Sequence, residues 1–178
     1  MGMNYQQMVD GCRRRNAKAQ RALYDELAPM CVGVCHRYVA DRDEAADMLQ
    51  DGFVHIFENI GKLRNPEKLR SWAYTVMVNT CVSYLRRSRK LVVKESLGEV
   101  PDEAEGDDLS PYSMNDLRRA LDSLTPWLRT AFNLCAVEGK SCAEAAEMMA
   151  TKESNVRLLV FRARAALRRE LETKKDEQ

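Results

Sequence analysis

The sequence predicts an all-α protein in which two small helical domains are joined by a flexible acidic linker. In both halves, apolar residues recur at intervals of three and four, which is the period of an amphipathic helix. No β-branched run bounded by hairpin turns interrupts this pattern. The net charge of +1 hides a segregation, because residues 1–90 carry +5, residues 91–112 carry −6 and residues 113–178 carry +2. We therefore place the domains at 1–90 and 113–178, with 91–112 as the linker.

The linker assignment rests on composition. The stretch 91–112 holds one basic and seven acidic residues together with two prolines and two glycines. Such a segment cannot bury enough apolar surface to order itself. When extended, these 22 residues reach at most roughly 70 to 80 Å, which is enough to let the two domains contact separate sites on one partner.

Composition also limits the class of protein. The chain is 45% hydrophobic and 31% charged, so it can build real cores, and wholesale disorder is excluded. Its longest uncharged run, residues 71–85, is shorter than the ~20 apolar residues of a membrane span. The first residues lack the basic and apolar stretches of a secretion signal. We expect a cytoplasmic protein without membrane insertion.

The first informative helix is expected over residues 44–58. Its periodicity predicts that Ala46, Leu49, Phe53 and Ile56 are buried. One exposed line, here called the acidic line, remains: Asp47, Gln50, Asp51, Val54 and Glu58. This line is either a solvated face or, because carboxylates repel phosphate, a surface for a protein partner.

The next helix, 69–88, is apolar almost all round except for one polar and aromatic stripe. The stripe consists of Trp72, Thr75, Asn79, Ser83 and Arg86, and Arg87 follows it. An aromatic ring beside amide and hydroxyl groups can stack on an unpaired base and bond its edges, while the arginines hold the backbone. Trp72 taken alone is also compatible with a core position.

Helix signals are explicit in the second domain. Thr125-Pro126 opens a helix that stops at Gly139, and Ser141 with Glu144 forms a capping box for a short helix to about Ala150. After a tight connection, Ser154 is expected to cap a last helix that runs to about Leu171. A short helix, a tight turn and a longer basic helix form the outline of a helix-turn-helix.

The last helix has two faces. Val156, Val160, Ala163 and Leu167 form the expected buried stripe. The opposite face carries five arginines, with Leu158 and Phe161 among them: Arg157, Arg162, Arg164, Arg168 and Arg169. A helix that enters a DNA major groove uses arginines for phosphates and guanine edges and apolar side chains for thymine methyls. We interpret this face as a DNA-reading surface, against the alternative of a solvated charged face.

Two rival readings remain open at this point. Cys31, Cys35, His36 and His55 could form a metal or redox site, although a fourth zinc ligand is not evident and buried reduced thiols are the simpler reading. The chain could also be a transcriptional regulator whose first domain senses a signal or dimerises. No nucleophile triad, metalloprotease motif or phosphate-cradling glycine loop is present in the sequence. We expect no catalytic residues, no cofactor and no metal.

Four stretches in this order resemble the extracytoplasmic-function (ECF) group of bacterial RNA polymerase sigma factors. DMLQDGF at 47–53 is similar to the family's D-L-x-Q-E-x-F, and residues 69–87 are similar to F-x-x-W-L-x-x-I-x-x-N-x-x-x-D-x-x-R. Residues 121–132 are similar to L-x-x-L-P-x-x-x-R-x-x-F. Residues 138–164 are similar to E-G-x-S-x-x-E-I-A followed by V-x-x-x-x-x-R-A-R. The chain departs from these patterns where Ser83 replaces a frequent Asp, where Thr125 interrupts Leu-Pro and where Ala145 replaces Ile. Leu158 and Leu159 also stand where small polar or basic residues are common in the family.

The resemblance implies a promoter-recognition subunit. Its partners would be core RNA polymerase, through the β′ clamp and the β subunit, then promoter DNA and an anti-sigma factor. The clamp would bind Asp47, Gln50 and Asp51. The loop 61–68 would help to pocket a flipped base, and the minus-10 element would contact Lys68, Trp72, Asn79, Ser83, Arg86 and Arg87. The minus-35 element would contact Asn155, Arg157, Leu158, Phe161, Arg162, Arg164 and Arg168.

Overall fold

The structure, a computed structural model, describes residues 3–88 and 113–175, and within them it contains helices and no β-strand. The chain divides into two compact units, Met1–Tyr84 and Leu85–Gln178. The predicted all-α, two-part fold class is therefore confirmed. The expected acidic linker, 91–112, lies outside the described residues.

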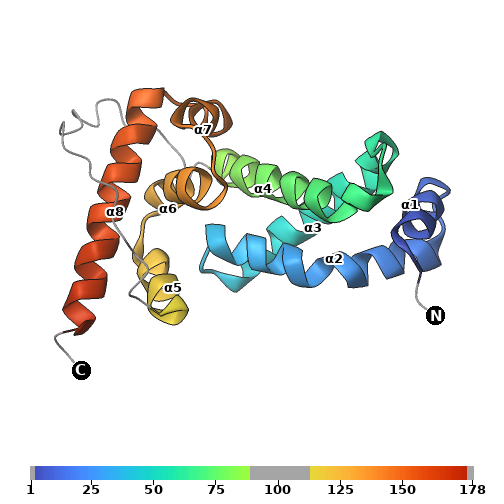
Figure 1. The fold of residues 1–178 in the computed structure, drawn as a ribbon, viewed down its shortest axis with the longest axis horizontal. Helices are drawn as coiled ribbons and strands as arrows, with labels where there is room; N and C mark the ends of the chain where they lie inside the picture. The colour runs from blue at the N-terminus through green and yellow to red at the C-terminus, as the bar shows by residue number, and fades with distance from the viewer. Residues whose placement is uncertain (1–2, 89–112, 176–178) are drawn as a thin grey trace. The chain divides into compact units, whose positions relative to one another are not determined.

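The first unit is built from four α-helices and two short 3-10 helices that precede the fourth (Figure 1). Their bounds are α1 Tyr5–Arg13, α2 Ala17–Tyr38, α3 Arg42–Asn59, η1 Ile60–Lys62, η2 Pro66–Lys68 and α4 Leu69–Arg87. Polar side chains start the first three helices. Asn4 forms a capping box with Gln7, Asn16 accepts from the Ala19 amide, and Asp41 accepts from two amides of α3.

The core of the first unit lies between α2, α3 and α4. Buried side chains from the three helices fill it, among them Leu23, Leu27, Val34, Met48, Ile56, Met77 and Cys81. At Gly52, α3 comes close to α4, because a Cβ there would lie 2.4 Å from the Cε of Met77. Nearby, His55 Nδ1 lies 3.0 Å from Thr80 Oγ1. The two helices are therefore in direct side-chain contact.

The inner face of α3 differs from the sequence prediction by a small rotation. Ala46 is exposed and Leu49 is only partly buried, whereas Ala45 and Met48 are buried, as are Gly52, Phe53 and Ile56. The pattern of hydrophobic residues did not assign Gly52 to the buried face, because glycine has no apolar side chain. Because Gly52 faces α4 and admits Met77, the inner stripe runs through residues 45, 48, 52 and 56.

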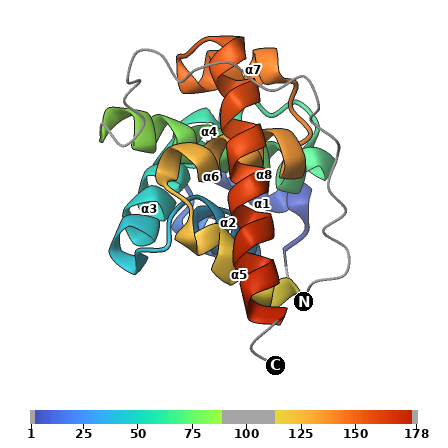
Figure 2. The same cartoon turned by 90° about the vertical axis from the view of Figure 1, so that its left-hand side faces the viewer.

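The second unit contains α5 Met114–Ser123, α6 Pro126–Phe132, the π-helical segment η3 Asn133–Val137, α7 Cys142–Met149 and α8 Glu153–Lys175. In Figure 1, α8 runs past α7, α6 and α5 in turn, and Figure 2 shows the same order from the side. The core of the second unit includes the buried side chains Ala120, Leu124, Phe132, Ala163, Leu167 and Leu171.

Most helix limits of the second unit follow the sequence signals. Thr125 caps α6 at Pro126, and Gly139 has the left-handed φ of +66° that ends the η3 segment. The Ser141–Glu144 capping box starts α7, and Ala150 ends it at φ +53°. The last helix differs, because the Asn155 and Val156 amides bond the Lys152 carbonyl. Helix α8 therefore begins at Glu153 rather than after Ser154, and it extends beyond Leu171 to Lys175.

A buried arginine holds the end of α5. The side chain of Arg129 is 6% exposed, and its Nη2 donates to the carbonyls of Asp122 at 2.6 Å and Leu124 at 3.3 Å. Its Nη1 also lies 3.7 Å from the Asp122 carboxylate. Burial lowers the pKa of Arg129, and Asp122 opposes that shift. Arg129 thus satisfies carbonyls that the last turn of a helix leaves unpaired.

Replacing Arg129 with methionine is expected to destabilise the second unit by about 2 kcal/mol, because one buried and one partly buried carbonyl lose their donor. Hydrogen exchange read by mass spectrometry checks this: protection should fall in α5 and α6 and stay unchanged in α2. Arg119→Met, which removes an exposed arginine of α5, serves as the control. Equal protection in the two variants would contradict the role of Arg129.

Candidate nucleic-acid and protein interfaces

Helix α8 is held as the second helix of a helix-turn-helix. The capping box of α7 orients the first helix, and the left-handed Ala150 reverses the chain into α8. Val156, Leu159, Ala163 and Leu167 are buried at 2% exposure or less. Because α8 packs on α5, α6 and α7, its opposite face remains available for a ligand.

That outer face is basic, as the sequence predicted. Arg157, Arg162 and Arg168 are exposed, while Asn155, Phe161 and Arg164 are partly exposed. The Arg157 guanidinium pairs with Glu153 at 2.5 Å, and this contact raises the pKa of the arginine. Asn155 Nδ2 donates to Thr151 Oγ1 at 3.0 Å. The face combines fixed cations with one amide and one aromatic ring.

Leu158 is an exception. It was expected on the basic face, but it is 2% exposed, so this expectation was wrong. An apolar side chain of this size gains ~2 kcal/mol when it leaves water, and its charged neighbours Arg157 and Arg162 gain nothing comparable. Leu158 is therefore removed from the set of candidate base contacts, whereas Phe161 stays in it.

Helix α4 presents the predicted polar and aromatic stripe. Thr75, Asn79, Arg86 and Arg87 are exposed, and Trp72 and Ser83 are partly exposed. Thr75 Oγ1 donates to the carbonyl of Ser71, one turn back. The stripe therefore lies at the surface of α4, and Trp72 is partly buried within it.

The loop before α4 adds positive charge beside that stripe. We define the capture loop as residues 61–68. Its exposed side chains include Lys62, Arg64 and Lys68, while Leu63 and the adjoining Leu69 are buried. Asn65 caps η2 by accepting from the Glu67 amide at 3.0 Å. The loop is thus anchored by apolar residues and presents cations to solvent.

The acidic line of α3 also lies at the surface. Asp47, Gln50, Val54 and Glu58 are exposed, and Asp51 is half-buried. Val54 is 48% exposed, which gives the line an apolar centre. Sequence reasoning missed Tyr24 of α2, whose ring centroid lies 4.4 Å from that of Phe53 and which is 38% exposed. Periodicity within one helix carries no signal for such a neighbour.

Three of the cysteines lie in the core of the first unit. Cys31, Cys35 and Cys81 are buried, with 3.9 Å between the sulfurs of Cys35 and Cys81 and 3.6 Å from Cys35 Sγ to Met77 Sδ. Burial raises the pKa of Cys31 to about 12. Across the described residues, no three histidine, cysteine or acidic side chains are grouped to hold a metal ion. The thiols act as small core residues.

In the part of the chain that the structure describes, no helix is both long and apolar enough to span a bilayer.

Comparison with known proteins assigns the family. Residues 23–91 match the model of Sigma-70 region 2, and residues 114–167 match that of Sigma-70, region 4. RNA polymerase sigma factor SigV of Bacillus subtilis is 30% identical over 140 residues, which cover 78% of this chain and 82% of SigV. This chain belongs to the ECF group of the sigma-70 family. The ECF RNA polymerase sigma-E factor of Haemophilus influenzae is 25% identical over 94% of this sigma factor and 95% of its own length.

A solved structure is also similar to this sigma factor. It is that of the sigma factor RpoE of Bartonella quintana in complex with the anti-sigma factor NepR. It is 25% identical, covers 81% of this chain and 91% of its own, and has a TM-score of 0.49. The family assignment rests on the sequence matches. As a member of this family, the ECF sigma factor acts in transcription initiation.

Proposed function

We propose that this sigma factor binds core RNA polymerase and directs it to promoters by contacting the minus-35 and minus-10 elements separately. The observation that carries the proposal is the pairing of two exposed surfaces of matching chemistry in one chain: the arginine face of α8 and the Trp72–Arg86 stripe of α4. A regulator that used its helix-turn-helix alone would need no such stripe.

The second unit is proposed to bind the minus-35 duplex. Arg157, Arg162 and Phe161 lie on the first half of the exposed α8 face, where a recognition helix contacts base edges. Asn155 adds an amide beside them. Arg164 and Arg168 follow along the helix and are assigned to phosphates, which carry affinity but no sequence information.

The first unit is proposed to bind the minus-10 element as a single strand. Trp72 supplies a stacking surface, Asn79 and Ser83 supply hydrogen bonds, and Lys68, Arg86 and Arg87 supply charge for the backbone. Opening a base pair costs a few kcal/mol, and trapping the unstacked base offsets that cost. Binding energy therefore drives strand separation, and neither catalysis nor nucleotide hydrolysis is assigned to this chain.

The acidic line is proposed to dock on the β′ clamp of the polymerase, with Asp47, Gln50 and Asp51 as its polar contacts. Its charge excludes nucleic acid as the partner, and the exposed Val54 provides an apolar anchor. Three further parts of the proposal come from the family resemblance alone. The second unit contacts the β subunit, the chain binds an anti-sigma factor, and it is located in the cytoplasm.

Initiation in a purified system tests the function. Overproduction followed by sequencing of transcript 5′ ends should reveal start sites that share two upstream elements. A template with those elements should then give a defined transcript with core polymerase plus this chain, and none with core polymerase alone. Identical transcripts with and without the chain would overturn the proposal and favour the regulator reading.

A further inference from the structure

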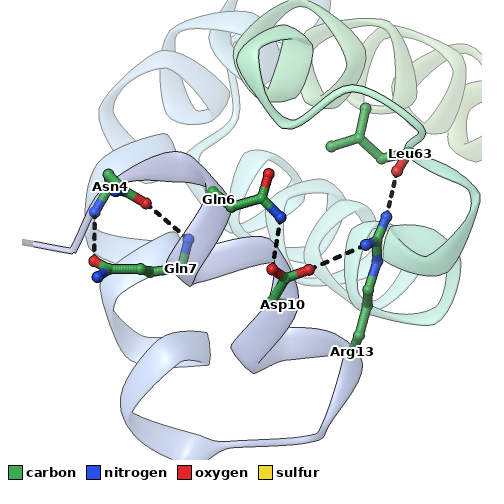
Figure 3. Close-up of polar contacts among 6 residues, drawn as sticks. All are labelled: Asn4, Gln6, Gln7, Asp10, Arg13 and Leu63. Atoms are coloured by element: carbon green, nitrogen blue, oxygen red, sulfur yellow. Dashed lines mark hydrogen bonds and ion pairs between the residues drawn. The ribbon is translucent and has the colours of Figure 1, made fainter.

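Helix α1 is tied to the capture loop at a point fifty residues later in the chain. It packs against both short helices of that region, η1 and η2. From its last turn, the Nη2 of Arg13 donates to the carbonyl oxygen of Leu63 at 2.5 Å (Figure 3). This carbonyl lies between η1 and η2, where it is outside a regular helix. Arg13 therefore fixes the backbone of the loop at its centre.

The guanidinium is itself held in place. Its Nη1 lies 3.1 Å from one carboxylate oxygen of Asp10, and Gln6 Nε2 donates to the other at 2.6 Å. Figure 3 shows Asp10 between the two donors, with Arg13 turned toward Leu63. The side chain of Arg13 is 35% exposed, and its guanidinium contacts both Asp10 and the Leu63 carbonyl. These linked contacts from Gln6 through Asp10 to Arg13 fix the orientation of the donor before a ligand arrives.

The position of α1 is fixed by close packing and by a second polar contact. A Cβ at Gly11 would lie 2.3 Å from the Cβ of Ala19, so the methyl group of Ala19 in α2 packs directly against the α1 backbone at Gly11. Tyr5 donates to Glu26 Oε1 at 3.0 Å, and Arg70 donates to the same oxygen at 2.8 Å. Arg70 lies two residues after the loop. Helix α1 thus supports the loop at its centre and, through Glu26, beyond its end.

We propose that Arg13 is a positioning residue for base capture: it holds the Leu63 carbonyl so that the capture loop is in place before the minus-10 strand separates. This proposal rests on the minus-10 function proposed above. The only regular structure in the loop is the end of η1 and the single turn of η2, and the loop presents Lys62, Arg64 and Lys68. A loop this irregular loses entropy when it is ordered, and bonds made in advance lower that cost on binding.

The test measures how holoenzyme binds single-stranded minus-10 oligonucleotides of the mapped promoter, with an abasic site placed at each position in turn. Wild type should lose affinity sharply at the position whose base the loop captures. Arg13→Ala should bind the intact strand about tenfold less well and show no further loss from the abasic site at that one position. Penalties at the other positions should be unchanged, which a general folding defect would not produce.

Two further variants keep the result decisive. Arg14→Ala removes the neighbouring exposed cation and should retain every abasic penalty. Asp10→Asn leaves Arg13 in place but removes the carboxylate that orients it. Its abasic penalty at the same position should be smaller than that of wild type. If Arg13→Ala or a folded Asp10→Asn keeps the full penalty there, the positioning role is overturned.

The outcome with wild type separates this proposal from the general function. Promoter-specific initiation without any position-selective penalty would overturn base capture and the role of Arg13, while the sigma function would stand. A failure of wild type to initiate at all would overturn the sigma function itself.

Discussion

Asp51→Arg is expected to weaken binding to core RNA polymerase by at least tenfold, because a charge reversal at a complementary interface costs several kcal/mol. Asp51 is half-buried in the middle of the acidic line, between Asp47 and Val54 on the helix face. A basic partner surface would then meet an arginine at the point of closest contact. The measurement is equilibrium binding of the full chain to purified core enzyme at two salt concentrations.

The control must carry the same change of charge outside the acidic line. Asp25→Arg meets this condition, since Asp25 is an exposed carboxylate of α2 with 55% of its side chain accessible. It should bind core enzyme as wild type does. Both variants should retain affinity for minus-35 duplex DNA, which is assigned to α8. Equal core binding by Asp51→Arg and wild type would remove the docking surface from α3.

The second large effect is expected at the DNA-reading helix. Arg162→Ala should cost about 1 to 3 kcal/mol at particular minus-35 base pairs and leave other positions unchanged. Arg168→Ala, two turns further along α8, should weaken binding to all sequences alike and reduce its salt dependence. The difference follows from their places on the helix: the first half of a recognition helix contacts base edges, and the second half passes the phosphates.

A scan of single base-pair changes across the minus-35 element, repeated with both variants, makes this comparison. The salt dependence of binding is measured for the same set. Two variants with the same loss profile across the scan would contradict the division between base and phosphate contacts, even if both bind weakly. Arg169→Ala, another exposed arginine of α8, provides a further reference for general charge loss.

The sequence predicted those features that depend on local chemistry. The capping box at Ser141, the proline start of α6 and the left-handed Gly139 are each decided within a few residues, and all three are present. The outward arginines of α8 also follow from periodicity, because a charged side chain is rarely buried unless a partner is buried with it.

The features that escaped prediction depend on contacts between distant segments. The Arg13–Leu63 bond joins residues fifty positions apart, and the packing of Tyr24 on Phe53 joins two helices. Leu158 shows the limit of helical periodicity. The period gives the side of the helix on which a residue lies, but it does not say which other parts of the protein bury that side. Arg129 was visible only as a motif position, and its role in closing α5 needed coordinates.

The glycine at position 52 lets α3 and α4, the helices that carry the two surfaces proposed for the first unit, pack closely. Its missing side chain lets Met77 lie directly against α3, while Asp51, next along the helix, and Asn79, two residues beyond Met77, both reach solvent. In the proposed function, this packed contact between α3 and α4 lies between the polymerase-binding and strand-binding surfaces, and such packing has low compressibility and transmits strain. We therefore expect that a change in the α3–α4 packing at Gly52 affects both proposed binding surfaces together.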